Sequence, residues 1–352
     1  SYFEGGYWIQ FVGPLIGFLT AFAFLQTGFA KNLRSWMEKS LKVYFFVVIG
    51  FALVYSLIGT VISFGWDYWT DFVREQDYNL STQTFTRWIT EYAQGFGISL
   101  VIGTLAIAIL YLIIAVAKQT WWIWGTVFAI AFMAVTSMLA PVYLAPIFNT
   151  YTEMPSSPLK DSVLQMAQAS GVPADNVYIY DRSRQTQSVS ANVSGFAGTT
   201  RISLADTLIE RESPGGVRSV LGHEIGHYVL QHTNSLFVMF AFLIIVAFAL
   251  THIPVNAIAK GERWGIRNIA DPAGMPLFFS VIGFIFLLAT PIQNNIIRFH
   301  EHQADIFGLS AAREPDGFAE SALLLSEYRK MEPSAFEEWF FYDHPSGYAR
   351  IH

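Results

Sequence analysis

The sequence predicts a predominantly α-helical, polytopic membrane protein that has about six spans and an α+β domain built from two extramembrane segments. Of its 352 residues, 53% are hydrophobic and only 14% are charged, whereas a soluble domain carries about 25% charged residues. The apolar residues form six uncharged blocks. Most of the charge lies in two stretches, 149–234 and 294–352, which also contain seven of the eight histidines. We therefore expect lipid around the blocks and water around the two stretches.

Each uncharged block is close to the roughly 20 apolar residues that a helix needs to cross the ~30 Å hydrocarbon core of a bilayer. Six such blocks in one chain favour membrane spans over buried core helices. The first block lacks a basic region before it and an obvious cleavage site, so we expect a span rather than a cleaved signal peptide. The blocks are Ile9–Gln26, Val43–Phe64, Phe96–Ala117, Trp121–Ala140, Leu236–Ile253 and Pro276–Ile292.

The blocks and the charged stretches divide the chain into four parts. We expect four spans in 1–148, a first extramembrane segment at 149–234, two further spans in 235–293 and a second extramembrane segment at 294–352. Because only two spans separate the extramembrane segments, both can emerge on one face of the membrane and form one domain.

The first extramembrane segment carries clear start and stop signals. Ser157-Pro158 is typical of an N-cap and first helical residue, and Gly171 of a helix end, so a helix is expected over Leu159–Ser170. Ser213-Pro214 opens a second helix by the same signal. Three short strands, separated in part by Gly195 and Gly198, are expected at Val177–Tyr180, Thr186–Val193 and Thr200–Ala205.

The composition excludes several classes of function. The chain has no cysteine, which excludes zinc fingers, iron–sulfur clusters and thiol catalysis. A net charge of −6, with 21 Lys and Arg against 27 Asp and Glu, argues against a nucleic-acid partner. The sequence carries no signal for a particular oligomeric state. The expected partners are the lipid bilayer and whatever substrate the extramembrane domain accepts.

The second helix contains the pattern His223-Glu224-Ile225-Gly226-His227, which is H-E-x-x-H. Residues i and i+4 lie one above the other on a helix face, so both imidazoles can reach one metal ion. Glu224 lies beside that ion, where a carboxylate can take a proton from water. This pattern predicts a metal site with a general base.

A catalytic zinc ion needs a third protein ligand and an open position. The best candidates follow the last span, where Glu301 and Asp305 share a helix face. Glu301 is a candidate third ligand, and Asp305 a carboxylate that orients a ligand imidazole. His300 and His302 are rival ligands that spacing alone does not exclude. His232 lies five residues after His227, about 140° round a continuous helix, so we expect it to be structural.

The motifs of the chain resemble those of a known family. His223–His227 followed by Glu301-x-x-x-Asp305 resembles the gluzincin arrangement, and the surrounding sequence resembles the integral-membrane CAAX prenyl endopeptidases over roughly four-fifths of the chain. The strings that carry this resemblance are Ala145-Pro146-Ile147-Phe148-Asn149, Arg201–Leu208, the His223 helix, His302-Gln303-Ala304-Asp305 and His344-Pro345 with Arg350.

The resemblance implies a zincin-like domain and a set of roles. It implies one zinc ion per chain, held by His223, His227 and Glu301, with Glu224 as the base. It also implies that His344 and Arg350 bind substrate and stabilise the oxyanion that develops during attack. The choice among Glu301, His300 and His302 is settled by this resemblance and not by spacing.

The stretch from Ser188 to Gly195 aligns with the edge strand over which an extended peptide would lie by β-augmentation. Family members carry Asn five residues before the glycine, where this chain has Ser190 and places Asn192 two residues later. Residues i and i+2 share a strand face, so Ser190 and Asn192 are both candidate substrate-binding residues.

The expected function is a membrane-embedded zinc endopeptidase. The resemblance implies prenylated C-termini as substrates, and a quality-control protease for membrane or exported proteins, without prenyl specificity, is the alternative. A transporter with a structural metal is less favoured, because the spans have no ionisable residue before His252 at a span end.

The resemblance and the loop charges bear on the membrane arrangement. Eukaryotic family members have seven spans that enclose a chamber; six are found here, so a reduced N-terminal region is expected and a closed chamber is an open question.

The loops at 27–42, 118 and 254–274 hold eight Lys and Arg, which places them in the cytoplasm by the positive-inside rule. The eukaryotic family implies the opposite orientation. For a prokaryotic chain the membrane is the cell inner membrane.

Overall fold

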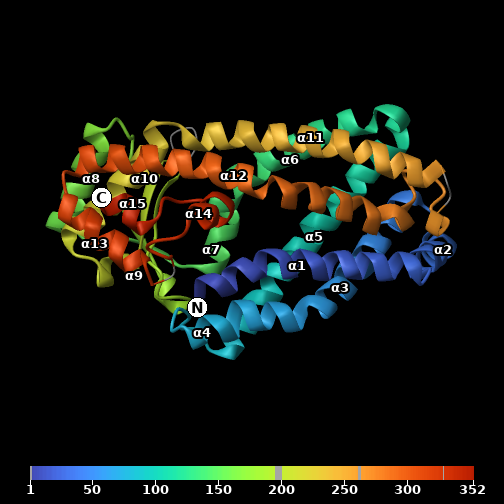
Figure 1. Cartoon of the computed structure of the whole chain (residues 1–352), viewed down its shortest axis with the longest axis horizontal. Helices are drawn as coiled ribbons and strands as arrows, with labels where there is room; N and C mark the ends of the chain where they lie inside the picture. Colours follow the sequence, from blue (N-terminus) through green and yellow to red (C-terminus); the bar gives the residue numbers. More distant parts are fainter. Residues whose placement is uncertain (1, 195–199, 261–262, 328) are drawn as a thin grey trace.

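The computed structural model describes residues 2–194, 200–260, 263–327 and 329–352. Figure 1 shows an elongated molecule, in which long helices extend from one end towards a second end that contains the sheet and the shorter helices. Gly195 and Gly198, which we expected to separate two strands, lie outside the described residues.

Five segments of the described chain are long and apolar enough to cross a membrane. One of them, residues 85–148, contains two helices joined by a turn at Lys118–Thr120, so the arrangement agrees with the expected six spans. The six helices are α1 (Tyr2–Gln26), α3 (Tyr44–Tyr68), α5 (Phe85–Ala117), α6 (Trp121–Leu139), α11 (His232–Lys260) and α12 (Met275–Ala312).

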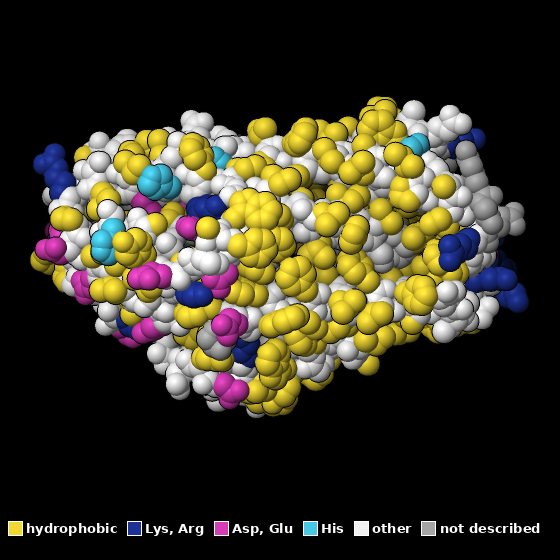
Figure 2. Space-filling model, viewed as in Figure 1, with side chains coloured by type: hydrophobic (Ala, Val, Ile, Leu, Met, Phe, Trp, Pro, Cys, Tyr) yellow, Lys and Arg dark blue, Asp and Glu magenta, His cyan; other side chains and the backbone are white. Residues whose placement is uncertain are grey.

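The surface of the long helices is apolar. Figure 2 shows hydrophobic side chains across the middle of the face in view, with charged side chains gathered towards the two ends. Val61 of α3 is 76% exposed and Val116 of α5 is 81% exposed. Exposure of so much apolar surface to water would be unfavourable, whereas contact with the lipid chains of a bilayer is favourable.

Helix α2 (Phe29–Leu41) was not expected from the sequence. It lies at the end of the molecule far from the sheet (Figure 1) and buries Leu33 and Met37 against the neighbouring helices. Its Arg34 is buried in an ion pair with Asp271, in the loop before α12. This ion pair favours the observed packing of α2 against the loop before α12, because either residue without its partner would be an uncompensated buried charge.

The sheet end consists of short elements. Its four-stranded sheet contains β1 (Tyr151–Glu153), β2 (Val177–Tyr180), β3 (Ala191–Ser194) and β4 (Arg201–Ala205) in the order β1-β2-β4-β3. Strands β2 and β4 are parallel, and the two outer strands are antiparallel to their neighbours. The remaining α-helices are α4 (Arg74–Asp77), α7 (Ala145–Phe148), α8 (Pro158–Ala169), α9 (Asp206–Arg211), α10 (Pro214–Val229), α13 (Pro315–Leu325), α14 (Ala335–Phe341) and α15 (Gly347–Ile351).

Helices α8 and α10 confirm the start signals. The side chain of Ser157 accepts a hydrogen bond from the amide of Lys160, and Pro158 opens α8. The side chain of Ser213 accepts from the amide of Gly216 at the start of α10. Gly171, just after α8, has a φ of 78°, a conformation that glycine adopts without strain.

The second expected strand begins later than predicted. We expected a strand over Thr186–Val193, but β3 covers Ala191–Ser194, and Thr186 forms only an isolated bridge with Ser81. The chain between them turns, because the Thr186 hydroxyl bonds to the Leu80 carbonyl and to the amide of Ser188. Local side-chain bonds of this kind compete with a strand ladder. The edge position of β3 agrees with the expectation.

Helix α12 joins the membrane region to the sheet end without a break. It has 38 residues and is about 57 Å long at 1.5 Å per residue, so it can cross a bilayer and continue well beyond it. The predicted boundary at residue 293 falls inside this helix. The four-part division of the chain stays a prediction. The continuous helix carries Glu301 and Asp305 rigidly to the sheet end.

Helices α10 and α12 meet through glycines. A Cβ added to Gly308 would lie 2.7 Å from the amide nitrogen of His223, and one added to Gly226 would lie 3.2 Å from the Cα of Ala304. No other residue allows the two backbones to approach this closely. The close approach brings the H-E-x-x-H residues against the face of α12 that carries Glu301.

Glu212 provides a pH-dependent test of this region. It precedes the N-cap of α10 and is 7% exposed, and its burial raises the pKa of its carboxyl to about 7. Because this pKa exceeds the unfolded value, stability falls as the pH rises from about 4.5 to 7 and stays lower above that. We expect Glu212→Gln to remove this loss and to stabilise the protein by on the order of 2 kcal/mol at pH 8.

The measurement is thermal unfolding in detergent micelles from pH 5 to pH 8. Exposed Glu210 on α9 provides the matched control, because Glu210→Gln should leave the pH profile unchanged. Parallel profiles for Glu212→Gln and the unaltered chain would contradict the prediction.

Candidate metal centre and catalytic cleft

Helix α10 presents the three polar side chains of H-E-x-x-H at its C-terminal half. Their positions follow from α-helical spacing, which brings His223 and His227 to the same face with Glu224 beside them. The two Nε2 atoms of the histidines lie 3.0 Å apart. Two ring nitrogens that converge in this way can share a cation.

Glu301 of α12 completes the cluster. Its Oε2 lies 3.2 Å from Nε2 of His223, and its Oε1 lies 3.4 Å from Nε2 of His227. Across the described part of the chain, these are the residues whose ligand atoms gather as in a metal site, all within 4.8 Å of one another.

The cluster fits a divalent cation such as zinc. Glu301 is buried, and its Oε2 makes no hydrogen bond within the described residues although ring nitrogens surround it. A buried carboxylate oxygen without a hydrogen bond costs free energy unless a cation compensates its charge. Two imidazoles and one carboxylate are also a ligand set of catalytic zinc sites, which leave a further position open.

The outer nitrogens of both imidazoles are held by side chains. Nδ1 of His223 lies 2.8 Å from Oδ1 of Asp305, the orientation expected for a carboxylate that fixes a ligand imidazole. Nδ1 of His227 lies 3.0 Å from Nδ1 of His232. Each candidate ligand histidine therefore has its own partner.

The expected position of His232 was wrong. Continuing α10 placed it about 140° round from the ligand face, but that helix ends at Val229 and Gln231 turns the chain with a φ of 54°. His232 begins α11 and is 2% exposed. The turn redirects its ring to His227, which no helical projection can show.

His344 and Arg350 reach the cluster from the C-terminal segment. Nε2 of His344 lies 3.1 Å from Oε2 of Glu301, and its Nδ1 lies 2.7 Å from Oδ1 of Asp343. The Nε of Arg350 lies 3.0 Å from Oδ2 of Asp305. This segment is tied to α12 in turn, because Arg298 donates to the carbonyl of Tyr342 at 2.8 Å.

The carboxylates of the cluster favour positive charge beside them, whether on an imidazole or on a bound cation. Burial lowers the pKa of His344, but the neighbouring carboxylates of Asp343 and Glu301 outweigh it and raise the pKa overall. Burial likewise opposes charge on His223, yet Asp305 and Glu301 raise its pKa to about 9. Burial raises the pKa of the Glu224 carboxyl. A carboxylate with a raised pKa is a stronger base.

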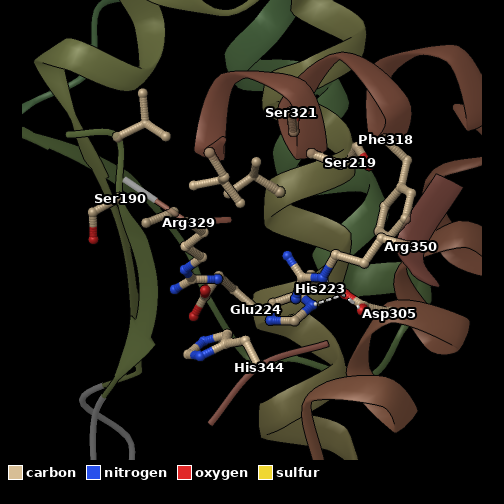
Figure 3. Close-up of a pocket in the computed structure, with 15 residues that line it drawn as sticks. Ser190, Ser219, His223, Glu224, Asp305, Phe318, Ser321, Arg329, His344 and Arg350 are labelled. Carbon is tan, nitrogen blue, oxygen red and sulfur yellow. Dashed lines mark hydrogen bonds and ion pairs between the residues drawn. The ribbon is translucent and has the colours of Figure 1, made fainter. Parts of the chain in front are cut away.

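A cavity of about 190 Å³ lies between β3 and α10. It is lined by Ser190, His223, Glu224, His344 and Arg350 together with apolar side chains. Figure 3 shows Glu224 and His344 pointing into the space between the strand that carries Ser190 and the helix that carries His223.

Asn192 does not line this cavity. Its Oδ1 accepts a hydrogen bond from the Ser194 hydroxyl at 3.1 Å on the same strand. The rival ligands also lie elsewhere: His300 faces the hydroxyl of Ser235 at 3.0 Å, and His302 is exposed.

The sequence reasoning missed three residues around the site. Asp343 could have been noticed as an acid directly before His344, and Gln303 as a polar neighbour of Glu301 within a motif that was quoted for its resemblance. Arg329 lines the cavity (Figure 3) and follows no motif. Only the folded chain brings it there.

Family models match nearly the whole chain. Residues 154–352 match the model described as peptidase family M48, and residues 5–150 match the model described as the CAAX prenyl protease N-terminal, five membrane helices. The chain belongs to peptidase family M48. It is therefore a metalloendopeptidase of this family, embedded in a membrane by its spans.

Individual M48 relatives resemble the chain to different extents. It is 26% identical over 348 residues to the uncharacterized metalloprotease YhfN of Bacillus subtilis, covering 97% of this chain and 81% of that protein. It is 28% identical over 273 residues to CAAX prenyl protease 1 of Saccharomyces cerevisiae, covering 72% of this chain and 59% of the yeast protein.

A solved structure of this kind has the same fold. The crystal structure of S. mikatae Ste24p superposes with a TM-score of 0.79 at 21% identity, covering 94% of this chain and 81% of that one. The expected fold class, a predominantly helical membrane protein with a small mixed sheet, is confirmed by this likeness.

Proposed function

We propose that the chain is a zinc endopeptidase in which His223, His227 and Glu301 hold one zinc ion and Glu224 is the general base. The convergence of the three ligand atoms within 4.8 Å, beside a cleft bordered by an edge strand, carries this proposal. A zinc ion bound there would polarise the scissile carbonyl and lower the pKa of a water molecule.

Glu224 moves the protons of the reaction. Its carboxylate lines the cleft next to His223, where it takes a proton from the attacking water. The same carboxyl then gives that proton to the amine that leaves. Its burial supports this role, because the raised pKa of Glu224 makes its carboxylate a stronger acceptor for the proton of the attacking water.

His344 and Arg350 stabilise the developing oxyanion. The raised pKa of His344 favours its protonated imidazole, whose Nε2 can donate a hydrogen bond to negative charge in the cleft. Asp343 holds the ring from the other side through Nδ1. Arg350 lines the same cleft with a guanidinium that carries a permanent charge.

The substrate lies along β3. This strand is at the edge of the sheet, so a peptide can extend the sheet through main-chain hydrogen bonds. Ser190 lines the cleft just before the strand begins, whereas Asn192 does not line it. Asn192 would contact substrate further along the strand.

The substrate class is the C-terminus of a prenylated protein. The names of the yeast and plant relatives support this choice, and so does the apolar wall that Val189, Val220 and Phe318 give the cleft. A protease for membrane or exported proteins without prenyl specificity is the alternative.

A farnesylated peptide should be cleaved at least about tenfold more efficiently than its unmodified twin, because tenfold corresponds to only ~1.4 kcal/mol of extra binding. The measurement is kcat/KM for both peptides with the purified chain in detergent or in liposomes. Equal values would favour the alternative substrate class.

Metal analysis tests the enzyme itself. The purified chain should contain about one zinc ion, and a chelator should remove both the zinc and the cleavage of a model peptide. Re-addition of zinc should restore cleavage. Cleavage that survives complete removal of metal would overturn the proposed function.

A further inference from the structure

A chain of hydrogen bonds begins behind the candidate ligand His227 and ends on α12. Nδ1 of His227 lies 3.0 Å from Nδ1 of His232, and Nε2 of His232 lies 3.3 Å from Oε1 of Gln303. The ring of His232 is shielded from water, because the residue is only 2% exposed. Gln303 stands two residues after Glu301 on the same helix.

The chemistry of the groups sets the direction of these bonds. An amide oxygen only accepts, so the hydrogen of a neutral His232 lies on Nε2 and its Nδ1 is an acceptor. His227 must then donate from Nδ1, which leaves the lone pair of its Nε2 free. That atom faces the cluster, 3.4 Å from Oε1 of Glu301.

The reverse assignment would prevent binding. If the amide of Gln303 donated instead, His232 would donate from Nδ1 and His227 would carry its hydrogen on Nε2. That hydrogen would point at the other ligand atoms, where a cation requires a lone pair. With the Gln303 oxygen towards His232, as the structure has it, the bonds agree with the tautomer of His227 that leaves its Nε2 free.

We propose that His232, supported by Gln303, is the positioning residue of His227. It fixes both the tautomer and the orientation of that imidazole, as Asp305 does for His223. Both partner systems are anchored on α12, the helix that also carries Glu301. This inference rests on the proposed function, because it requires His227 to be a ligand.

His232 also links the site to a span. It is the first residue of α11, which continues into the membrane. Its ring packs against His300 of α12, with the ring centroids 4.7 Å apart. The ring of His227 is therefore held in place by contacts with α11 and α12, two helices that enter the bilayer, as well as by its own helix α10.

The test is zinc affinity, measured on the purified full chain by competition with a chromophoric chelator. Loss of an outer partner of a ligand histidine weakens metal binding about 10–100-fold, and this is the loss expected for His232→Ala. Gln303→Glu keeps an acceptor and should bind zinc as tightly as the unaltered chain. Gln303→Lys offers only donors and should weaken binding about as much as His232→Ala.

Two further measurements separate positioning from a structural role. The melting temperature of the metal-free protein should stay the same across the Gln303 variants, whereas a structural role would lower it in step with affinity. The visible spectrum of the cobalt-substituted protein should change in Gln303→Lys and not in Gln303→Glu. His302→Ala, at an exposed neighbour on α12, is the matched control and should change nothing.

The inference is overturned if His232→Ala is folded and binds zinc within about twofold of the unaltered chain. Where His232→Ala does not fold, equal zinc affinity of Gln303→Glu and Gln303→Lys overturns it instead. If the unaltered chain binds no zinc, both the proposed function and this inference are overturned. If it binds zinc and the variants show no loss, only this inference is overturned.

Discussion

Glu224→Gln is expected to keep one zinc ion per chain and to lower the rate of peptide cleavage by at least about 10²–10⁴-fold, the range that general base catalysis contributes. The amide has the shape of the carboxylate but cannot take a proton from water. Glu224 lines the cleft and is not among the three clustered ligand residues, so metal content should not change. The measurements are zinc per chain and kcat on a model peptide.

The matched control for this variant is Glu210→Gln, because Glu210 is exposed on α9 and lines no part of the cleft. It should retain both zinc and activity. Turnover of Glu224→Gln close to that of the control would exclude Glu224 as the base. Loss of zinc in Glu224→Gln would instead show that the carboxylate helps to hold the metal.

His223→Ala is expected to lose zinc as well as activity. Its imidazole lies 3.2 Å from Glu301 and 3.0 Å from the ring of His227, so its removal takes away one of three ligands. The loss of zinc affinity should exceed the roughly 10–100-fold that follows loss of an orienting partner. Chelator competition measures the affinity, and peptide cleavage measures the activity.

His302→Ala is again the matched control, since His302 was a rival ligand by spacing and is exposed in the structure. It should bind zinc normally. Stoichiometric, tightly held zinc in His223→Ala would refute the assignment of the ligands, and loss of zinc in His302→Ala would point to a different third ligand.

Local signals in the sequence predicted individual elements well. Uncharged blocks predicted the spans, because the bilayer excludes charge wherever it lies in the chain. Ser157 and Ser213 predicted two helix starts, because an N-cap acts on amides only a few residues away. The pairing of His223 with His227 followed from the helical repeat alone.

The errors came from turns and from contacts between distant segments. His232 was misplaced because Gln231 turns the chain, with a φ of 54°, after α10 ends. The strand predicted from Thr186 was interrupted by bonds to Leu80, more than 100 residues earlier. A single turn and a hydrogen bond to a distant residue leave no periodic pattern in the sequence, so hydrophobic periodicity does not predict them.

The sequence by itself determined that the chain avoids water over six blocks and carries an H-E-x-x-H helix, because both properties depend on neighbours along the chain. The tertiary structure decided which residue lies beside the two histidines. Spacing favoured Glu301 without excluding His300 and His302, and the close packing of α12 on α10 through Gly308 directs the buried Glu301 to the cluster while His302 faces outwards. Such a choice depends on which faces of two helices meet, and that is settled only when the whole chain packs.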